Sequence, residues 1–252
     1  MADDNMKKKR GQVTMFIILG IIIVSVILVY FLWVRPTYTG AKSAEIGFES
    51  CIKDVIEQSI DELEKKGGFI NPEFYHTYKD EKFPYLCYTD EYYQTCTVQV
   101  PFIKNSFDKQ LEIFSKEKIS KCYDDSLESL RAQGYSVSRG EIIYDILIEP
   151  GTVRVELEAP TTVGTQGFTK FNVKISSPIY EMLMISTSII QFEAKYGDAD
   201  TSSIMIYYPD YIVDKIKLSD GVTLYILENK ITKNKFQFAS KSLVWPAGYA
   251  FQ

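Results

Sequence analysis

The order of apolar and polar residues divides the chain into three stretches with different periods. The first, from Val13 to Val34, is apolar throughout, with Thr14 and Ser25 as its only polar side chains. As a helix with a rise of about 1.5 Å per residue, it would reach about 33 Å, enough to cross a hydrocarbon core of about 30 Å. The pattern therefore predicts a transmembrane helix over residues 13–34.

The end of this stretch distinguishes an anchor from a cleaved secretory signal. Tyr30 and Trp33 belong to an aromatic belt of the kind found at membrane surfaces, and Arg35-Pro36 follows it. A secretory signal would have a shorter apolar run and a cleavage site of small residues. We expect the proline to stop the helix, so that residues 35–43 form a linker behind a membrane anchor.

The cations near this helix predict its orientation. Four of them, at positions 7 to 10, precede the helix, whereas Arg35 and Lys42 follow it closely. By the positive-inside rule, residues 1–12 form a cytoplasmic basic tail and residues 35–252 lie outside the cell membrane. The expected partner of residues 13–34 is the lipid bilayer, which the chain crosses once.

The second stretch has the period of amphipathic helices. Between residues 44 and 66, apolar side chains recur on one helical face, and Gly67-Gly68 ends the pattern. A similar pattern covers residues 106–133 and stops at Gly134. We expect the two helices to pack together in a helical subdomain, residues 44–140.

All four cysteines, Cys51, Cys87, Cys96 and Cys122, fall within this subdomain. An even number on the oxidising side of a membrane predicts two disulfides, and the spacing lacks the Cys-x-x-Cys pattern of a zinc site. Three pairings are possible. We favour Cys87–Cys96, which closes a short loop, and Cys51–Cys122, which would join the two helices if they pack antiparallel.

Residues 69–104, between the two helices, are rich in tyrosine and in turn-forming residues. Tyrosine provides a large amphipathic contact area at low entropic cost. The rings could form a contact surface for a partner, or they could fill a small core around the Cys87–Cys96 loop, and the second interpretation is favoured. The tyrosines concerned are Tyr75, Tyr78, Tyr85, Tyr88, Tyr92 and Tyr93.

After Gly140 the period changes to two. Residues 152–159 and 168–176 alternate apolar and polar side chains, as in antiparallel strands with one face in water. Ser177-Pro178 starts a helix that carries too many charges to cross a membrane, and Asp220-Gly221 predicts a hairpin. We therefore expect residues 141–252 to form an antiparallel sheet with one packed helix. The fold class is α+β.

Few residues suggest catalysis or ligand binding. His76 is the only histidine, and neither Gly-x-Ser-x-Gly nor a phosphate-binding loop occurs. Residues 1–44 carry a net charge of +4 and the other residues −9, which together give −5. Such an acidic domain lacks the clustered cations that nucleic acids require. We expect no enzyme, no cofactor or metal, and no nucleic-acid partner.

The junction "KRGQV" (residues 9–13) resembles the class III signal of archaeal type IV prepilins, in which a basic residue and a glycine precede the apolar helix. The resemblance implies cleavage between Gly11 and Gln12 on the cytoplasmic side, so that the helix stays in the mature protein. Phe16 departs from the pattern, because pilin-like proteins often carry glutamate at the fifth mature position. Residues 7–23 also resemble the start of single-pass surface proteins of small-genome archaea.

Two non-catalytic functions follow from these features. The first is a membrane-tethered cell-surface protein whose external domain binds or adheres to a partner, or has a structural role in the cell envelope. The second is a pilin-like filament subunit cleaved after Gly11. A filament helix usually continues into the globular head. The helix stop expected at Arg35-Pro36 and the missing glutamate therefore favour the tether.

Overall fold

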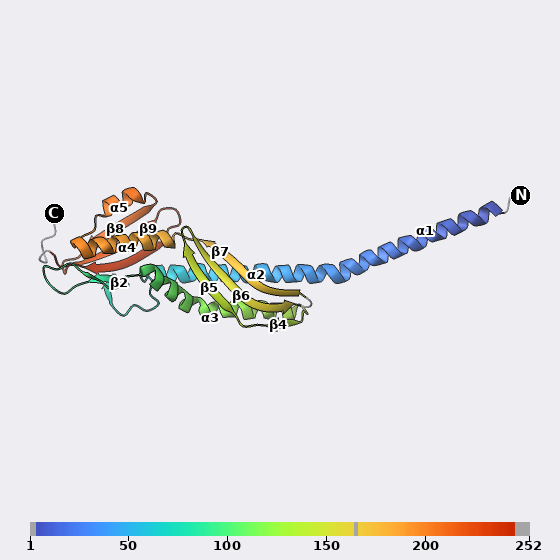
Figure 1. Ribbon diagram of the computed structural model, residues 1–252, viewed down its shortest axis with the longest axis horizontal. Coiled ribbons are helices and arrows are strands. Elements are labelled where there is room, and N and C mark those ends of the chain that lie inside the picture. Colours follow the sequence, from blue (N-terminus) through green and yellow to red (C-terminus); the bar gives the residue numbers. More distant parts are fainter. Residues whose placement is uncertain (1–3, 164–165, 245–252) are drawn as a thin grey trace.

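A computed structural model describes residues 4–163 and 166–244 of the chain (Figure 1). Its longest feature is an N-terminal helix in three successive segments: α1 (Asp4–Val29), a π-helical turn (Tyr30–Val34) and α2 (Arg35–Glu64). Together they span about 90 Å at a rise of about 1.5 Å per residue. α1 projects away from the rest of the molecule, whereas the end of α2 is built into the globular part, residues 47–244.

The helix stop expected at Arg35-Pro36, and with it the linker over residues 35–43, is wrong. α2 begins directly after the π-helical turn, and Pro36 is its second residue. Proline is tolerated in the first turn of a helical segment, where its missing N–H is not needed. A π-helical turn also shifts the hydrogen-bond register of a long helix and so accommodates such a defect. The apolar helix therefore continues into the globular part.

α2 and α3 (Ile103–Ala132) form an antiparallel helix pair. Phe48 on α2 contacts Tyr123 near the end of α3, with ring centroids 5.5 Å apart, whereas Gly68 lies against Phe107 near the start of α3. Gly68 has a φ of 90° and donates its N–H to the Leu63 carbonyl at 2.8 Å. This left-handed cap ends α2 where the glycine pair predicts.

A first sheet packs against one side of this helix pair (Figure 1). The strands are β4 (Val137–Arg139), β5 (Ile143–Glu149), β6 (Thr152–Val163) and β7 (Gln166–Ser176), and β6 pairs antiparallel with the other three. The alternation predicted for residues 152–159 is confirmed, because the apolar positions are buried and the charged positions are not. On the outer face, Lys170 and Glu158 form a 2.5 Å ion pair between β7 and β6.

A second sheet lies at the end of the molecule opposite α1, with the strand order β1–β2–β10–β9–β8 and a short β3 beside β2. Its strands are β1 (Tyr75–Tyr78), β2 (Glu81–Tyr88), β3 (Thr97–Val98), β8 (Tyr211–Lys217), β9 (Val222–Asn229) and β10 (Lys235–Lys241). β8 and β9 form the hairpin predicted at Asp220-Gly221, where Gly221 has a φ of 85°. α4 (Ile179–Tyr196) packs on one face, and α5 (Thr201–Tyr207) connects α4 to β8.

This second sheet departs from the sequence prediction in its pairing. β2 lies within residues 69–104, for which the sequence predicts turns rather than a central strand. It pairs in parallel with β10, whereas the sequence predicts only antiparallel pairing. Strand pairing and a continuous apolar core therefore cross residue 140. The chain does not separate there into a helical subdomain and a sheet subdomain, because each contributes strands to the same sheet.

Candidate functional site

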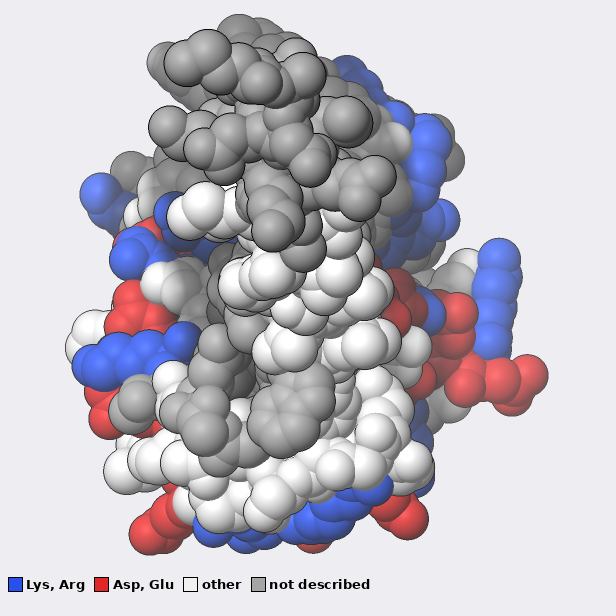
Figure 2. All heavy atoms as spheres, turned by 90° about the vertical axis from the view of Figure 1, so that its right-hand side faces the viewer, with Lys and Arg blue, Asp and Glu red and all other residues white. Residues whose placement is uncertain are grey.

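One helix in the described part of the chain is long and apolar enough to cross a membrane, over Met15–Leu32. Its large apolar side chains are 48–74% exposed, so none of them contributes to the core. The Ser25 hydroxyl donates to the Ile22 carbonyl at 2.8 Å, which satisfies the polar group within the helix. Figure 2, viewed from the side to which α1 projects, shows an uncharged described surface in front and charged side chains around it. This arrangement suits a membrane anchor or a signal.

The residues of the predicted cleavage site, Gly11 and Gln12, lie within α1. Cleavage between them stays a prediction from the resemblance to prepilin signals. The helical backbone runs through this junction without interruption.

Both disulfides have the pairing that the sequence favours. Cys51–Cys122 joins α2 to α3 with a Cα–Cα distance of 5.9 Å, and Cys87–Cys96 joins β2 to the segment before β3 at 5.3 Å. Cys87, Cys96 and Cys122 are buried, and Cys51 is half-buried. These sulfurs are therefore part of the core, and their accessibility does not suit thiol–disulfide exchange.

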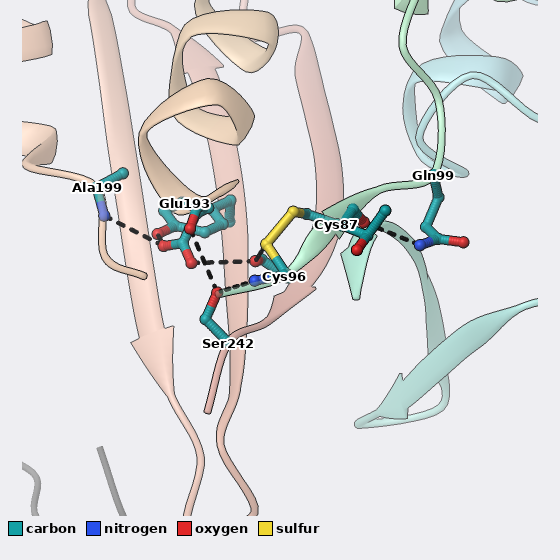
Figure 3. Close-up of a disulfide and its surroundings, with 9 residues drawn as sticks. Cys87, Cys96, Gln99, Glu193, Ala199 and Ser242 are labelled. Carbon is teal, nitrogen blue, oxygen red and sulfur yellow. Dashed lines mark hydrogen bonds between the residues drawn. A yellow bond between two sulfur atoms is a disulfide. The ribbon is translucent and has the colours of Figure 1, made fainter. Parts of the chain in front are cut away.

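Glu193, a buried residue of α4, lies beside the Cys87–Cys96 disulfide (Figure 3). The Glu193 carboxylate accepts hydrogen bonds from the Tyr225 hydroxyl of β9, the Ser240 hydroxyl of β10 at 3.1 Å and the Ala199 N–H at 3.2 Å. Burial raises the pKa of Glu193, and the hydrogen bond from Tyr225 opposes this rise. The Glu193 side chain thus connects α4 to β9 and β10 of the second sheet by hydrogen bonds.

The same residue is connected to the disulfide through the backbone. The Ser242 hydroxyl donates to the Glu193 carbonyl at 3.4 Å and accepts the N–H of Cys96 at 3.1 Å (Figure 3). The Cys96 sulfur lies 3.5 Å from the Ser240 hydroxyl. Because Glu193 is only 1% exposed, a substrate could not reach it, and the arrangement is suited to holding the fold together.

The six tyrosines do not form one surface. Tyr85 is buried and packs with Tyr88 and Phe74, with ring centroids 4.6–4.9 Å apart. Tyr92 and Tyr93, in the loop after β2, are 64% and 76% exposed. Tyr75 and Tyr78, on β1, are half-buried, and lysine side chains lie over their rings. Residues 69–104 therefore contain both kinds of tyrosine that the sequence suggests. The rings on β2 pack in a small core, whereas the rings in the loop after β2 are exposed to solvent.

A groove of about 380 Å³ lies next to the β2 rings. Its apolar lining residues are Phe69, Pro72, Phe74, Pro84, Tyr85 and Val100. Phe74 is 46% exposed, which adds to the apolar surface at this end of the molecule.

His76 lies on β1, with Nδ1 3.3 Å from the Tyr85 hydroxyl. In residues 4–163 and 166–244, no group of three His, Cys, Asp or Glu side chains has an arrangement that could hold a metal ion. The His76 ring is half-buried, and its centroid lies 6.3 Å from that of the Tyr85 ring.

Two functional features escape prediction from the sequence. Glu64 and Glu193 look like ordinary charged positions on helices, yet both are buried. The helical period gives the one available signal, because Glu193 falls three and four residues after the buried Ile190 and Ile189. The hydroxyl groups that donate to the Glu193 carboxylate belong to strands more than 30 residues later in the chain. No local sequence pattern therefore predicts these hydrogen bonds.

These features define an α+β protein with an N-terminal apolar helix and two disulfides. No protein-family model, curated protein or solved structure matches the chain.

Proposed function

We propose that this chain is a single-pass, membrane-tethered cell-surface protein whose globular part makes non-catalytic contacts with a partner in the cell envelope. One observation carries the proposal: the exposed apolar span Met15–Leu32 continues without a break into α2, whose second half is part of the core. An apolar surface of this size costs free energy in water and is removed from it by a bilayer. The helix would then hold the globular part at the membrane on a stiff stalk.

Two further features support the external location of the globular part. The cations at positions 7–10 favour a cytoplasmic N-terminus by the positive-inside rule. Two buried disulfides are typical of proteins that fold in an oxidising compartment. The rings of Tyr92 and Tyr93 are exposed in the loop between β2 and β3 and are suited to contact with another protein.

A pilin-like filament subunit is the second candidate, and the continuous helix favours it. A filament packs its subunits through long apolar helices that continue into their heads, and the helix here passes Pro36 without stopping. This removes one of the two arguments for the tether. The other argument remains, because Phe16 occupies the position where pilin-like proteins often carry glutamate.

Protease added to intact cells or right-side-out vesicles tests the shared topology. Cleavage of the globular part is expected, and its complete protection would overturn both candidates. The mature N-terminus, read by mass spectrometry, then separates them. A chain that starts at Gln12, and that Gly11→Val leaves uncleaved, supports the filament subunit. Recovery of Met1 peptides at full stoichiometry from native membranes supports the tether.

A further inference from the structure

A groove of about 420 Å³ lies where the two sheets meet. It is formed by the Gly151 turn between β5 and β6, the start of α4, the segment from α5 to β8, and the turn between β9 and β10. The last two are joined by a hydrogen bond from the Lys230 N–H to the Asp210 carbonyl, 2.8 Å long. The groove is thus built from four separate parts of the chain and held by backbone contacts.

Tyrosine rings form much of its wall. Tyr208 and Tyr211 meet edge to face, with centroids 6.4 Å apart and planes at 84°. Tyr211 is buried, so the residues packed around it hold its ring in place. Tyr207 lines the same groove and is 81% exposed. Aromatic faces carry partial negative charge and attract cations.

Carboxylates give the groove a negative charge. Glu181 and Asp210 both line it, whereas no Lys, Arg or His is among the described lining residues. Glu181 Oε1 accepts the Gly151 N–H at 3.1 Å, but its Oε2 is buried and has no partner within the described chain. The nearby Lys230 ammonium donates to the Pro209 carbonyl at 2.5 Å and does not neutralise these acids directly. The groove therefore offers acceptors and rings to a cation.

Two exposed aliphatic residues are sequence neighbours of residues that line the groove. Ile206 and Ile231 are 77% and 76% exposed, and each adjoins a lining residue, Tyr207 and Thr232 respectively. The apolar part of a bound protein segment could pack on these two side chains and remove them from water. A free small amine would leave them in water.

We propose that this groove binds a lysine or arginine side chain of a partner protein. The cationic head lies between the tyrosine rings and the carboxylates of Glu181 and Asp210, and the neighbouring apolar side chains of the partner pack on Ile206 and Ile231. This assignment rests on the proposed function, in which the globular part contacts a partner, and it adds where that contact lies and what chemistry it requires.

Saturation-transfer NMR of the full chain in deuterated detergent tests the assignment with defined probes. The first probe is acetyl-Leu-Lys-Leu-amide, and the second has norleucine in place of lysine. We expect the lysine peptide to bind about tenfold more tightly than the norleucine peptide, and the double variant Glu181→Gln/Asp210→Asn to lose that difference. Both replacements keep a carbonyl oxygen, so the Gly151 hydrogen bond and the fold are retained.

A matched control removes the same charge elsewhere. Glu117→Gln/Asp125→Asn alters two exposed acids of α3 and should bind both peptides like the unmodified chain. Equal binding of the two peptides, or unchanged lysine-peptide binding by the groove variant, would overturn the proposal. So would 1,5-diaminopentane binding as tightly as the lysine peptide, since the apolar surroundings would then have no role. The measurement needs no membrane orientation, so its outcome is separate from that of the protease test.

Discussion

Glu64, the last residue of α2, has a fully buried carboxyl group. Its Oε2 accepts the Asn234 amide at 2.9 Å, whereas Oε1 is buried and has no partner within the described chain. Burial raises the pKa of Glu64 to about 8, and the hydrogen bond from Asn234 opposes this rise. At neutral pH the folded chain therefore keeps this carboxyl group protonated. This avoids burying a charge where the end of α2 meets the second sheet.

The stability of the protein should depend on pH through this group. The unfolded chain loses the Glu64 proton near pH 4.5, whereas the folded chain keeps it up to about pH 8. The free energy of unfolding should therefore fall across that interval and change little above it. Glu64→Gln cannot ionise, and we expect it to remove a fall on the order of a few kcal/mol. Urea unfolding of the detergent-solubilised chain at a series of pH values measures the effect.

The exposed Glu62, on the same helix turn, offers a control. Glu62→Gln should unfold with the pH dependence of the unmodified chain. Some dependence should remain in Glu64→Gln, because burial also raises the pKa of Glu193 and acts with the same sign. If Glu64→Gln and the unmodified chain lose stability in parallel between pH 5 and about pH 8, Glu64 is charged in the folded state after all.

At the scale of elements, the alternation of apolar and polar residues predicted strands that pair with their neighbours in the chain. Val153, Val155 and Leu157 alternate with charged residues, and β6 pairs with its immediate neighbours β5 and β7. β2 shows why other elements escape prediction. It is buried on both faces and contains Pro84, so it lacks the alternation of a strand with one face in water. β1 and β3 pair with it locally, but its parallel partner β10 lies about 150 residues later, and no local pattern indicates that pairing. The continuation of the N-terminal helix past Pro36 also escaped prediction, because the sequence alone does not reveal the π-helical turn before it.

The two disulfides should differ in how much they stabilise the fold. Cys51–Cys122 spans 71 residues and Cys87–Cys96 spans 9. In the chain-entropy model the longer loop contributes roughly 4 kcal/mol and the shorter one roughly 2–3 kcal/mol. We therefore expect Cys51→Ala/Cys122→Ala to lower the midpoint of thermal unfolding more than Cys87→Ala/Cys96→Ala. Differential scanning calorimetry of the two double variants makes the comparison, and the reverse order would contradict it.

The continuity of the long helix is measurable as a distance. Spin labels at Leu28, before the π-helical turn, and at Glu57, on the exposed face of α2, are 29 positions apart in one helical run. We expect a single narrow distance distribution near about 43 Å in electron paramagnetic resonance of the chain in nanodiscs. A hinge at Pro36 would instead give a broad distribution shifted to shorter distances. Pro36→Ala serves as the control, because removing the proline should leave the distance unchanged.

At the scale of the whole molecule, the globular part carries its own core. In the described chain, every buried apolar side chain lies at residue 48 or later, and one continuous cluster joins α2, α3, α4 and both sheets. Residues 15–32, in α1 and the π-helical turn, add apolar surface without adding to this core. The apolar span 15–32 therefore adds no buried contacts to the folded core, although the backbone helix joins the two without a break.

Fragments of the chain test this integration. Residues 44–252, secreted into an oxidising compartment, should fold and unfold in one cooperative transition, because they retain both disulfides and the whole core. Residues 141–252 alone should show no such transition. They lack β2, which pairs with β10, and the helix pair that covers the first sheet, so they would expose Val153, Val155 and Phe238 to water. Circular dichroism and calorimetry follow both fragments. A cooperative transition in the shorter fragment would restore the two-subdomain division at residue 140. Its absence from both fragments would mean that the helical residues before position 44 contribute to the stability of the fold.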